Sequence, residues 1–102
     1  AAATAARLLG LDEAQALHAL ALAFNRCGGS FQSHVDGSLG VRITQAWVAE
    51  AGITCAQFAQ AGLTGPRNFL TGLYGYPHLY GRDTLSVDDL VRANPHCFDA
   101  AL

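Results

Sequence analysis

The sequence contains no lysine and no methionine, and it has few charged residues of either sign. Charged residues make up 14% of the 102 residues, whereas hydrophobic residues make up 51%. An average soluble domain carries about 25% charged residues, so these charges are too few to cover a free-standing globule with polar surface. We therefore expect the chain to be a piece of a larger protein. Lysine chemistry is excluded from this segment.

The positive charge of the chain is scattered. All six basic residues are arginines, and the formal net charge is -2. Nucleic acids and acidic membrane surfaces attract proteins through clustered positive charge, so neither is expected as a partner. Charged residues also interrupt every apolar run before it reaches the roughly 18 to 20 residues that span a bilayer.

The cysteine pattern and the first residues of the chain indicate in which cellular compartment the protein is expected. Cys27, Cys55 and Cys97 are odd in number and widely spaced, which predicts no disulfide framework and favours a reducing cytoplasm. The alanine-rich start lacks the basic region of a signal peptide. We interpret residues 1–9 as a helix entered midway, with further chain expected upstream.

Helical patterns dominate the first quarter of the chain. Residues 1–9 are good helix formers, and Gly10 stands where a left-handed C′ residue is favoured. Asp12 and Gln15 have the spacing of a capping box that opens a second helix over residues 13–27. That helix is apolar nearly all round, which predicts burial on most sides.

A third helical pattern covers residues 39–62. Gly52 interrupts it as a break or as a tight packing point, so the pattern indicates one long helix or two abutting helices. Ile43 and Trp47 lie near its apolar face, and we expect Trp47 in the core. Cys27 and Cys55 occupy small-hydrophobe positions of helical stripes, which predicts that both are buried.

The last third of the chain is less regular. Thr64-Gly65-Pro66 predicts a stop followed by a proline-initiated short helix. The aromatic stretch over residues 71–81 is interrupted by glycines and is expected to be irregular. Ser86 and Asp89 form a second capping box, which opens a helix that ends at about Ala93.

The best local candidate for a site is the polar loop over residues 31–38. His34, Asp36 and Arg42 lie where this loop leads into a helix, so backbone N–H groups and an arginine fork are predicted to face a carboxylate ligand. A plainer interpretation remains open, in which residues 36–38 form a turn and helix N-cap and Arg42 is a solvated or salt-bridged helix residue.

Other kinds of catalytic or metal site have little support. The four histidines and three cysteines do not fall at the spacing of a zinc site, so no metal is expected. The chain has no Gly-x-Ser-x-Gly nucleophile elbow, and nothing local would depress the pKa of a buried cysteine thiol.

Several motifs together resemble the MmgE/PrpD family. They are Leu-Leu-Gly-Leu-Asp-Glu over 8–13, the Asp-Gly-Ser loop over 36–38, Ala-Gly-Leu-Thr-Gly-Pro-Arg over 61–67 and Gly-Leu-Tyr-Gly over 72–75. The resemblance is strongest over residues 1–82. It implies an all-α fold, in which residues 1–102 are a partial, antiparallel segment of the family's large helical domain. It also implies a longer parent protein with a second α+β lid domain.

The resemblance implies a chemistry as well. The family includes 2-methylcitrate dehydratase, cis-aconitate decarboxylase and iminodisuccinate epimerase, which need no cofactor. The implied parent is a cytoplasmic homodimer that acts as a lyase or isomerase on a small di- or tricarboxylate. Arg42 would bind a substrate carboxylate, and His34 or Asp36 would orient the substrate or exchange a proton.

The chain departs from the family at two positions. Many members carry Lys and His in the motif Asp-Gly-Ser-x-x-Lys-Arg-Leu-His, where this chain has Val41 and Thr44. A further family histidine would lie upstream of Ala1. The alternative is therefore a non-catalytic helical packing or dimerisation module, and we predict no turnover by these 102 residues alone.

Overall fold

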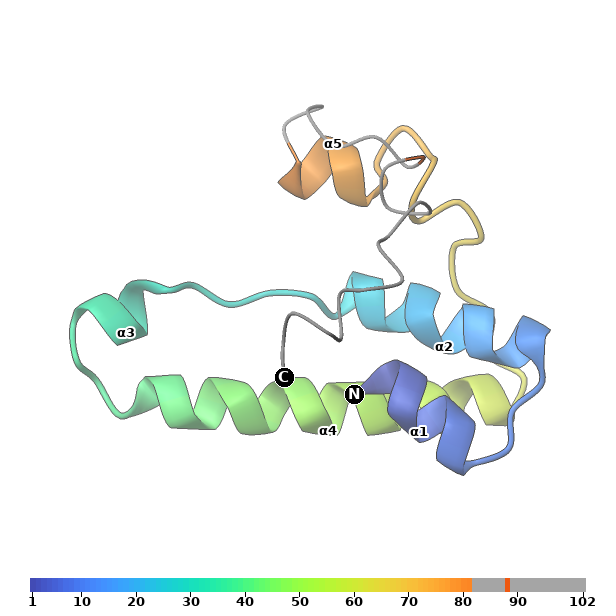
Figure 1. Ribbon diagram of the computed structural model, residues 1–102, viewed down its shortest axis with the longest axis horizontal. Coiled ribbons are helices and arrows are strands. Elements are labelled where there is room, and N and C mark those ends of the chain that lie inside the picture. Colours follow the sequence, from blue (N-terminus) through green and yellow to red (C-terminus); the bar gives the residue numbers. More distant parts are fainter. Residues whose placement is uncertain (82–87, 89–102) are drawn as a thin grey trace. The chain divides into compact units, whose positions relative to one another are not determined.

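The computed structural model describes residues 1–81 and residue 88 (Figure 1). The part described contains helices and no strand, so the all-α prediction is confirmed. None of its helices is long and apolar enough to cross a membrane. The chain divides into two units, residues 1–67 and residues 68–102. The helices are α1 (Ala2–Leu8), α2 (Glu13–Asn25), α3 (Gln32–Val35), α4 (Gly40–Gln60) and α5 (Tyr76–Tyr80).

The junction between α1 and α2 forms as its sequence predicts. Gly10 adopts a left-handed conformation with φ of 68°, which a residue without Cβ adopts at little cost. The side chain of Asp12 accepts a hydrogen bond from the N–H of Gln15 at 2.8 Å. The side chain of Gln15 in turn accepts one from the N–H of Asp12 at 3.2 Å, which completes the capping box.

The first unit is built around the contact between α2 and α4, which run antiparallel (Figure 1), with α1 packed on both. Its core consists of small side chains that allow the helix backbones to approach closely. The buried members of this cluster are Ala5, Ala6, Ala19, Ala56 and Ala59.

Two helix predictions are settled by the structure. The pattern over residues 39–62 forms one uninterrupted helix, α4, in which Gly52 is a buried packing point against α1. The helix predicted over residues 13–27 ends two residues early, at Asn25. Cys27 therefore lies beyond α2 and is exposed, so its predicted burial is wrong, whereas Cys55 is buried as predicted.

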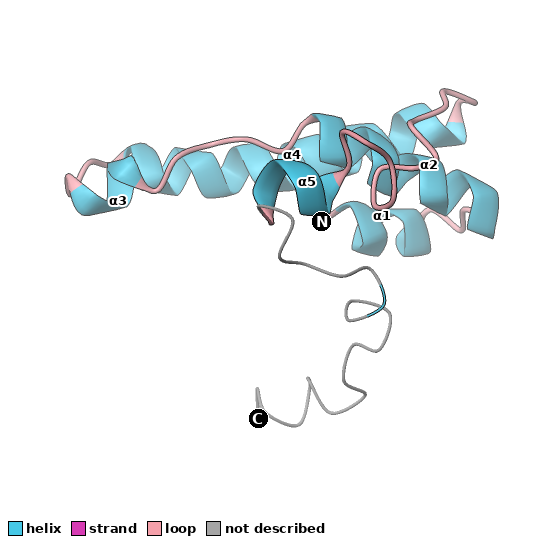
Figure 2. Ribbon diagram, turned by 90° about the horizontal axis from the view of Figure 1, so that it is seen from above, coloured by secondary structure: helices cyan, strands magenta, loops and turns pink. Residues whose placement is uncertain are grey.

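The prediction that Trp47 lies in the core is wrong for this chain. Trp47 is 61% exposed and Ile43 is 51% exposed. The reason is visible in Figures 1 and 2, because the first half of α4 extends beyond the end of α2. Of the described elements, the short helix α3 and the extended segment before it lie beside that half. An apolar helix face is buried only where another element covers it.

The predictions for residues 64–81 are partly wrong. No helix follows Pro66, since residues 67–75 form turns in which the N–H of Tyr76 donates to the carbonyl of Phe69 at 2.7 Å. A short helix with proline in its first turn does form, but at Pro77, inside the stretch expected to be irregular. The predicted capping box of Ser86 and Asp89 lies outside the described residues.

Candidate functional site

The segment that joins α2 to α4 carries the predicted site. It leaves the end of α2 through Gly28 and Gly29, runs alongside α4 and returns through α3 (Figure 1). The predicted loop over residues 31–38 is therefore partly helical, because α3 occupies its centre. The N–H of Gln32 donates to the hydroxyl of Ser30 at 3.1 Å, which satisfies a donor in the first turn of α3.

His34 projects from α3 onto a cavity of about 290 Å³, here called the loop cavity. Its ring lies 4.6 Å from the ring of Phe31, centroid to centroid, and the side chain is exposed. The loop cavity is lined by residues 28–30, Phe31 and His34 from the connecting segment and by Val41, Thr44 and Gln45 from α4. His34 is thus the one titratable side chain in this lining.

Asp36 ends α3 and forms a contact of its own. Its carboxylate accepts a hydrogen bond from the side-chain amide of Gln32 at 2.7 Å. Gly37 follows with φ of 67°, so the Asp-Gly turn of the plainer interpretation is present. Asp36 does not cap α4, however, because the N-cap residue of that helix is Leu39, which makes no side-chain cap.

Arg42 lies in the first turn of α4 and is exposed. Among the residues that the structure describes, it makes no ion pair, and it is not part of the lining of the loop cavity. The structure therefore brings His34 to a cavity but does not bring Asp36 and Arg42 to the same one.

The two positions at which the chain departs from the family motif both line the loop cavity. Val41 adds an aliphatic side chain, and Thr44 adds a hydroxyl that donates to the carbonyl of Gly40 at 3.0 Å. That donor is already in use, so Thr44 offers a ligand only the acceptor lone pairs of its oxygen.

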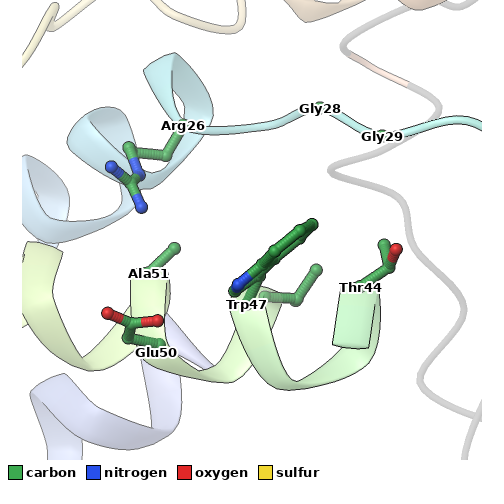
Figure 3. Close-up of a pocket in the computed structure, with 8 residues that line it drawn as sticks. Arg26, Gly28, Gly29, Thr44, Trp47, Glu50 and Ala51 are labelled. Carbon is green, nitrogen blue, oxygen red and sulfur yellow. The ribbon is translucent and has the colours of Figure 1, made fainter. Parts of the chain in front are cut away.

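A second cavity, of about 450 Å³, adjoins the first and is here called the α2–α4 cavity (Figure 3). The two cavities share Gly28, Gly29 and Thr44 in their linings. Arg26, Trp47 and Glu50 also line the α2–α4 cavity. The sequence does not identify these three as site residues, because Arg26 is one of several scattered arginines and Trp47 is expected in the core.

The two cysteines of the described part differ in exposure, since Cys27 is exposed and Cys55 is buried. Burial raises the pKa of the Cys55 thiol, the positive charge of Arg26 acts in the opposite direction and Cys27 adds to the increase. Cys55 therefore stays protonated and is a poor nucleophile. Within residues 1–81 and 88, no three His, Cys, Asp or Glu side chains form a group able to hold a metal ion.

Comparison with known protein families matches residues 1–86 to the MmgE/PrpD N-terminal domain. No curated protein and no solved structure matches the chain. The match covers most of the 102 residues and includes α1 to α5 together with the loop cavity. The chain therefore belongs to the MmgE/PrpD family.

Proposed function

We propose that this chain is part of a cofactor-independent lyase or isomerase that acts on a small di- or tricarboxylate. The observation that carries the proposal is the position of His34. It is the titratable side chain of the loop cavity, and it faces the two α4 positions where many family members carry Lys and His. A histidine is suited to proton transfer near neutral pH.

Asp36 and Arg42 complete the proposed site from the edges of this segment. Asp36 is held on α3 by its hydrogen bond to Gln32, so it would orient α3 and with it His34. Arg42 presents a guanidinium in the first turn of α4, where the helix dipole also favours an anion. The proposed parent is a cytoplasmic homodimer, to which the remainder of the enzyme contributes further substrate contacts.

The test is a titration of the chain with citrate, used as a simple tricarboxylate and followed by calorimetry. If Arg42 binds a carboxylate, Arg42→Gln weakens citrate binding by about 2 kcal/mol, which is the scale of a charged hydrogen bond. Arg7→Gln is the matched control, since Arg7 is an exposed arginine on α1. Equal affinities of the Arg42→Gln variant and the unaltered chain would leave Arg42 without a binding role.

One observation favours a second candidate function, that of a helical packing or dimerisation module. Large apolar side chains of α4 and of its N-cap residue are exposed, among them Trp47 at 61% and Leu39 at 84%. Exposed apolar surface of this kind promotes association. Sedimentation equilibrium separates the two candidates, because a chain that dimerises but does not bind citrate supports the module.

A further inference from the structure

The α2–α4 cavity carries opposite charges on its two sides. Arg26 reaches from the end of α2 toward α4, and Glu50 lies on α4 (Figure 3). Within the described part of the chain, neither residue forms an ion pair, although both line the same cavity. The cavity thus offers a cationic group and an anionic group that do not neutralise each other directly.

The part of the cavity lining that α4 contributes beside these charges is largely apolar. Trp47 and Val48 line the cavity from α4, and Trp47 is 61% exposed. An exposed indole face attracts both alkyl groups and cations. The cavity volume of about 450 Å³ falls in the range of small-molecule sites, which extends from about 300 to 1,000 Å³.

Next to Arg26 in the chain, the backbone of the connecting segment adds N–H hydrogen-bond donors to the cavity lining. Gly28 and Gly29 line the cavity without side chains, and no residue of the described chain accepts a hydrogen bond from their N–H groups. Gly29 has φ of 105°, a conformation that side chains rarely tolerate, so this stretch of backbone stays uncovered. Arg26 and these N–H groups suit a carboxylate, whereas Glu50 and Trp47 suit an ammonium group.

We propose that the α2–α4 cavity binds a zwitterionic amino carboxylate, with its carboxylate at Arg26 and its ammonium group at Glu50. A di- or tricarboxylate does not meet this arrangement, because Glu50 repels a second carboxylate. The proposed ligand therefore differs in charge from the substrate proposed for the loop cavity. Its apolar side chain would lie against Trp47 and Val48.

The experiment uses three probes that differ by one charged group. L-Norleucine has both groups, hexanoate lacks the ammonium group and pentylamine lacks the carboxylate. Trp47 is the only tryptophan of the chain, so its fluorescence reports binding at the cavity directly. We expect norleucine to change the emission saturably, and to bind at least about tenfold more tightly than either singly charged probe.

Two variants test which side chain binds each charged group of norleucine. Arg26→Gln weakens norleucine binding by about tenfold and leaves pentylamine binding unchanged, whereas Glu50→Gln weakens norleucine by a similar factor and leaves hexanoate no weaker. The matched controls are Arg7→Gln and Glu13→Gln, which remove exposed charges outside the cavity and should bind norleucine as the unaltered chain does.

Three results would overturn the proposal: no saturable change with norleucine, equal affinity for the three probes, or variants that bind as tightly as the unaltered chain. If a substitution lowers the helical circular dichroism, discrimination among the probes by the unaltered chain decides alone. Citrate binding by Arg42→Gln is measured separately, so failure of one proposal is distinguishable from failure of the other.

Discussion

The backbone N–H of Gly65 donates a hydrogen bond to Nδ1 of His18 at 3.2 Å, across 47 positions of the sequence. This contact joins the segment after α4 to the middle of α2. The approach is close, because a Cβ on Gly65 would lie 2.7 Å from the Cβ of Ala21 and 2.8 Å from the backbone nitrogen of Leu22. Glycine is therefore required here by space.

We expect Gly65→Ala to lower the free energy of unfolding by about 2 kcal/mol, the scale of overpacking against backbone that cannot move far. Urea denaturation followed by circular dichroism measures the change. Gly28→Ala is the control, because a Cβ there meets nothing within 4 Å, and its effect should stay within about 0.5 kcal/mol. Equal effects of the two substitutions would show that Gly65 is not packed on α2.

Gly52 provides a second test, in which helix propensity and packing predict opposite signs. In the interior of a helix, alanine is more favourable than glycine by about 1 kcal/mol. At Gly52, however, a Cβ would lie 2.7 Å from the backbone nitrogen of Ala2 and 2.9 Å from the carbonyl carbon of Ala1. We expect packing to prevail, so that Gly52→Ala lowers the free energy of unfolding by about 1 kcal/mol.

Ala49→Gly is the companion variant for this prediction. Ala49 is exposed on the same helix, so the change tests propensity alone and should cost about 1 kcal/mol. An increase in stability from Gly52→Ala would mean that α1 does not pack on α4 at this point.

The capping box at the start of α2 makes a third prediction. Asp12→Ala removes the acceptor for the N–H of Gln15 and should lower the free energy of unfolding by about 1 kcal/mol. Asp12→Asn keeps a side-chain oxygen at the same place and should lose much less. Urea denaturation of both variants measures the difference, and equal losses would assign the effect to the charge of Asp12 rather than to its hydrogen bond.

Gly10 and the Asp12 capping box could be predicted from the sequence because their geometry depends on residues within a few positions. The exposure of Trp47 could not be predicted in this way, since it depends on which element covers the first half of α4. The short helix begins near Pro77 rather than Pro66, and its position depends on how the preceding turns fold back on the chain. The N–H of Tyr76 reaches the carbonyl of Phe69 through the intervening turn.

The candidate site was predicted only in part for a similar reason. His34 lies on a cavity, but Arg42 does not, because α4 turns by about 100° per residue and Val41 faces the loop cavity instead. Val41, Thr44 and Val48 follow the helical spacing that places side chains on one face. That spacing is the signal that identifies the cavity side of α4, whereas Arg26 joins it only through the packing of α2.

A fourth prediction concerns the reactivity of Cys55, which is 3% exposed. Burial raises the pKa of its thiol, and the charge of Arg26 partly opposes this. In a Cys97→Ser background, we expect iodoacetamide at neutral pH to label the exposed Cys27 and to spare Cys55 until the chain unfolds. Mass spectrometry of the labelled peptides measures both sites, and equal labelling of the native chain would contradict the burial of Cys55.

The same raised pKa has a consequence for stability. The folded chain holds the Cys55 proton more tightly than the unfolded chain. Its contribution to stability is therefore fully present below the pKa of the unfolded thiol and is lost as the pH rises through the raised pKa of the folded thiol. Cys55→Ala, which has no proton to lose, should show a smaller decrease in the free energy of unfolding across that range. Arg26→Gln should raise the pKa of the Cys55 thiol in the folded chain further, because the charge that lowers it is gone.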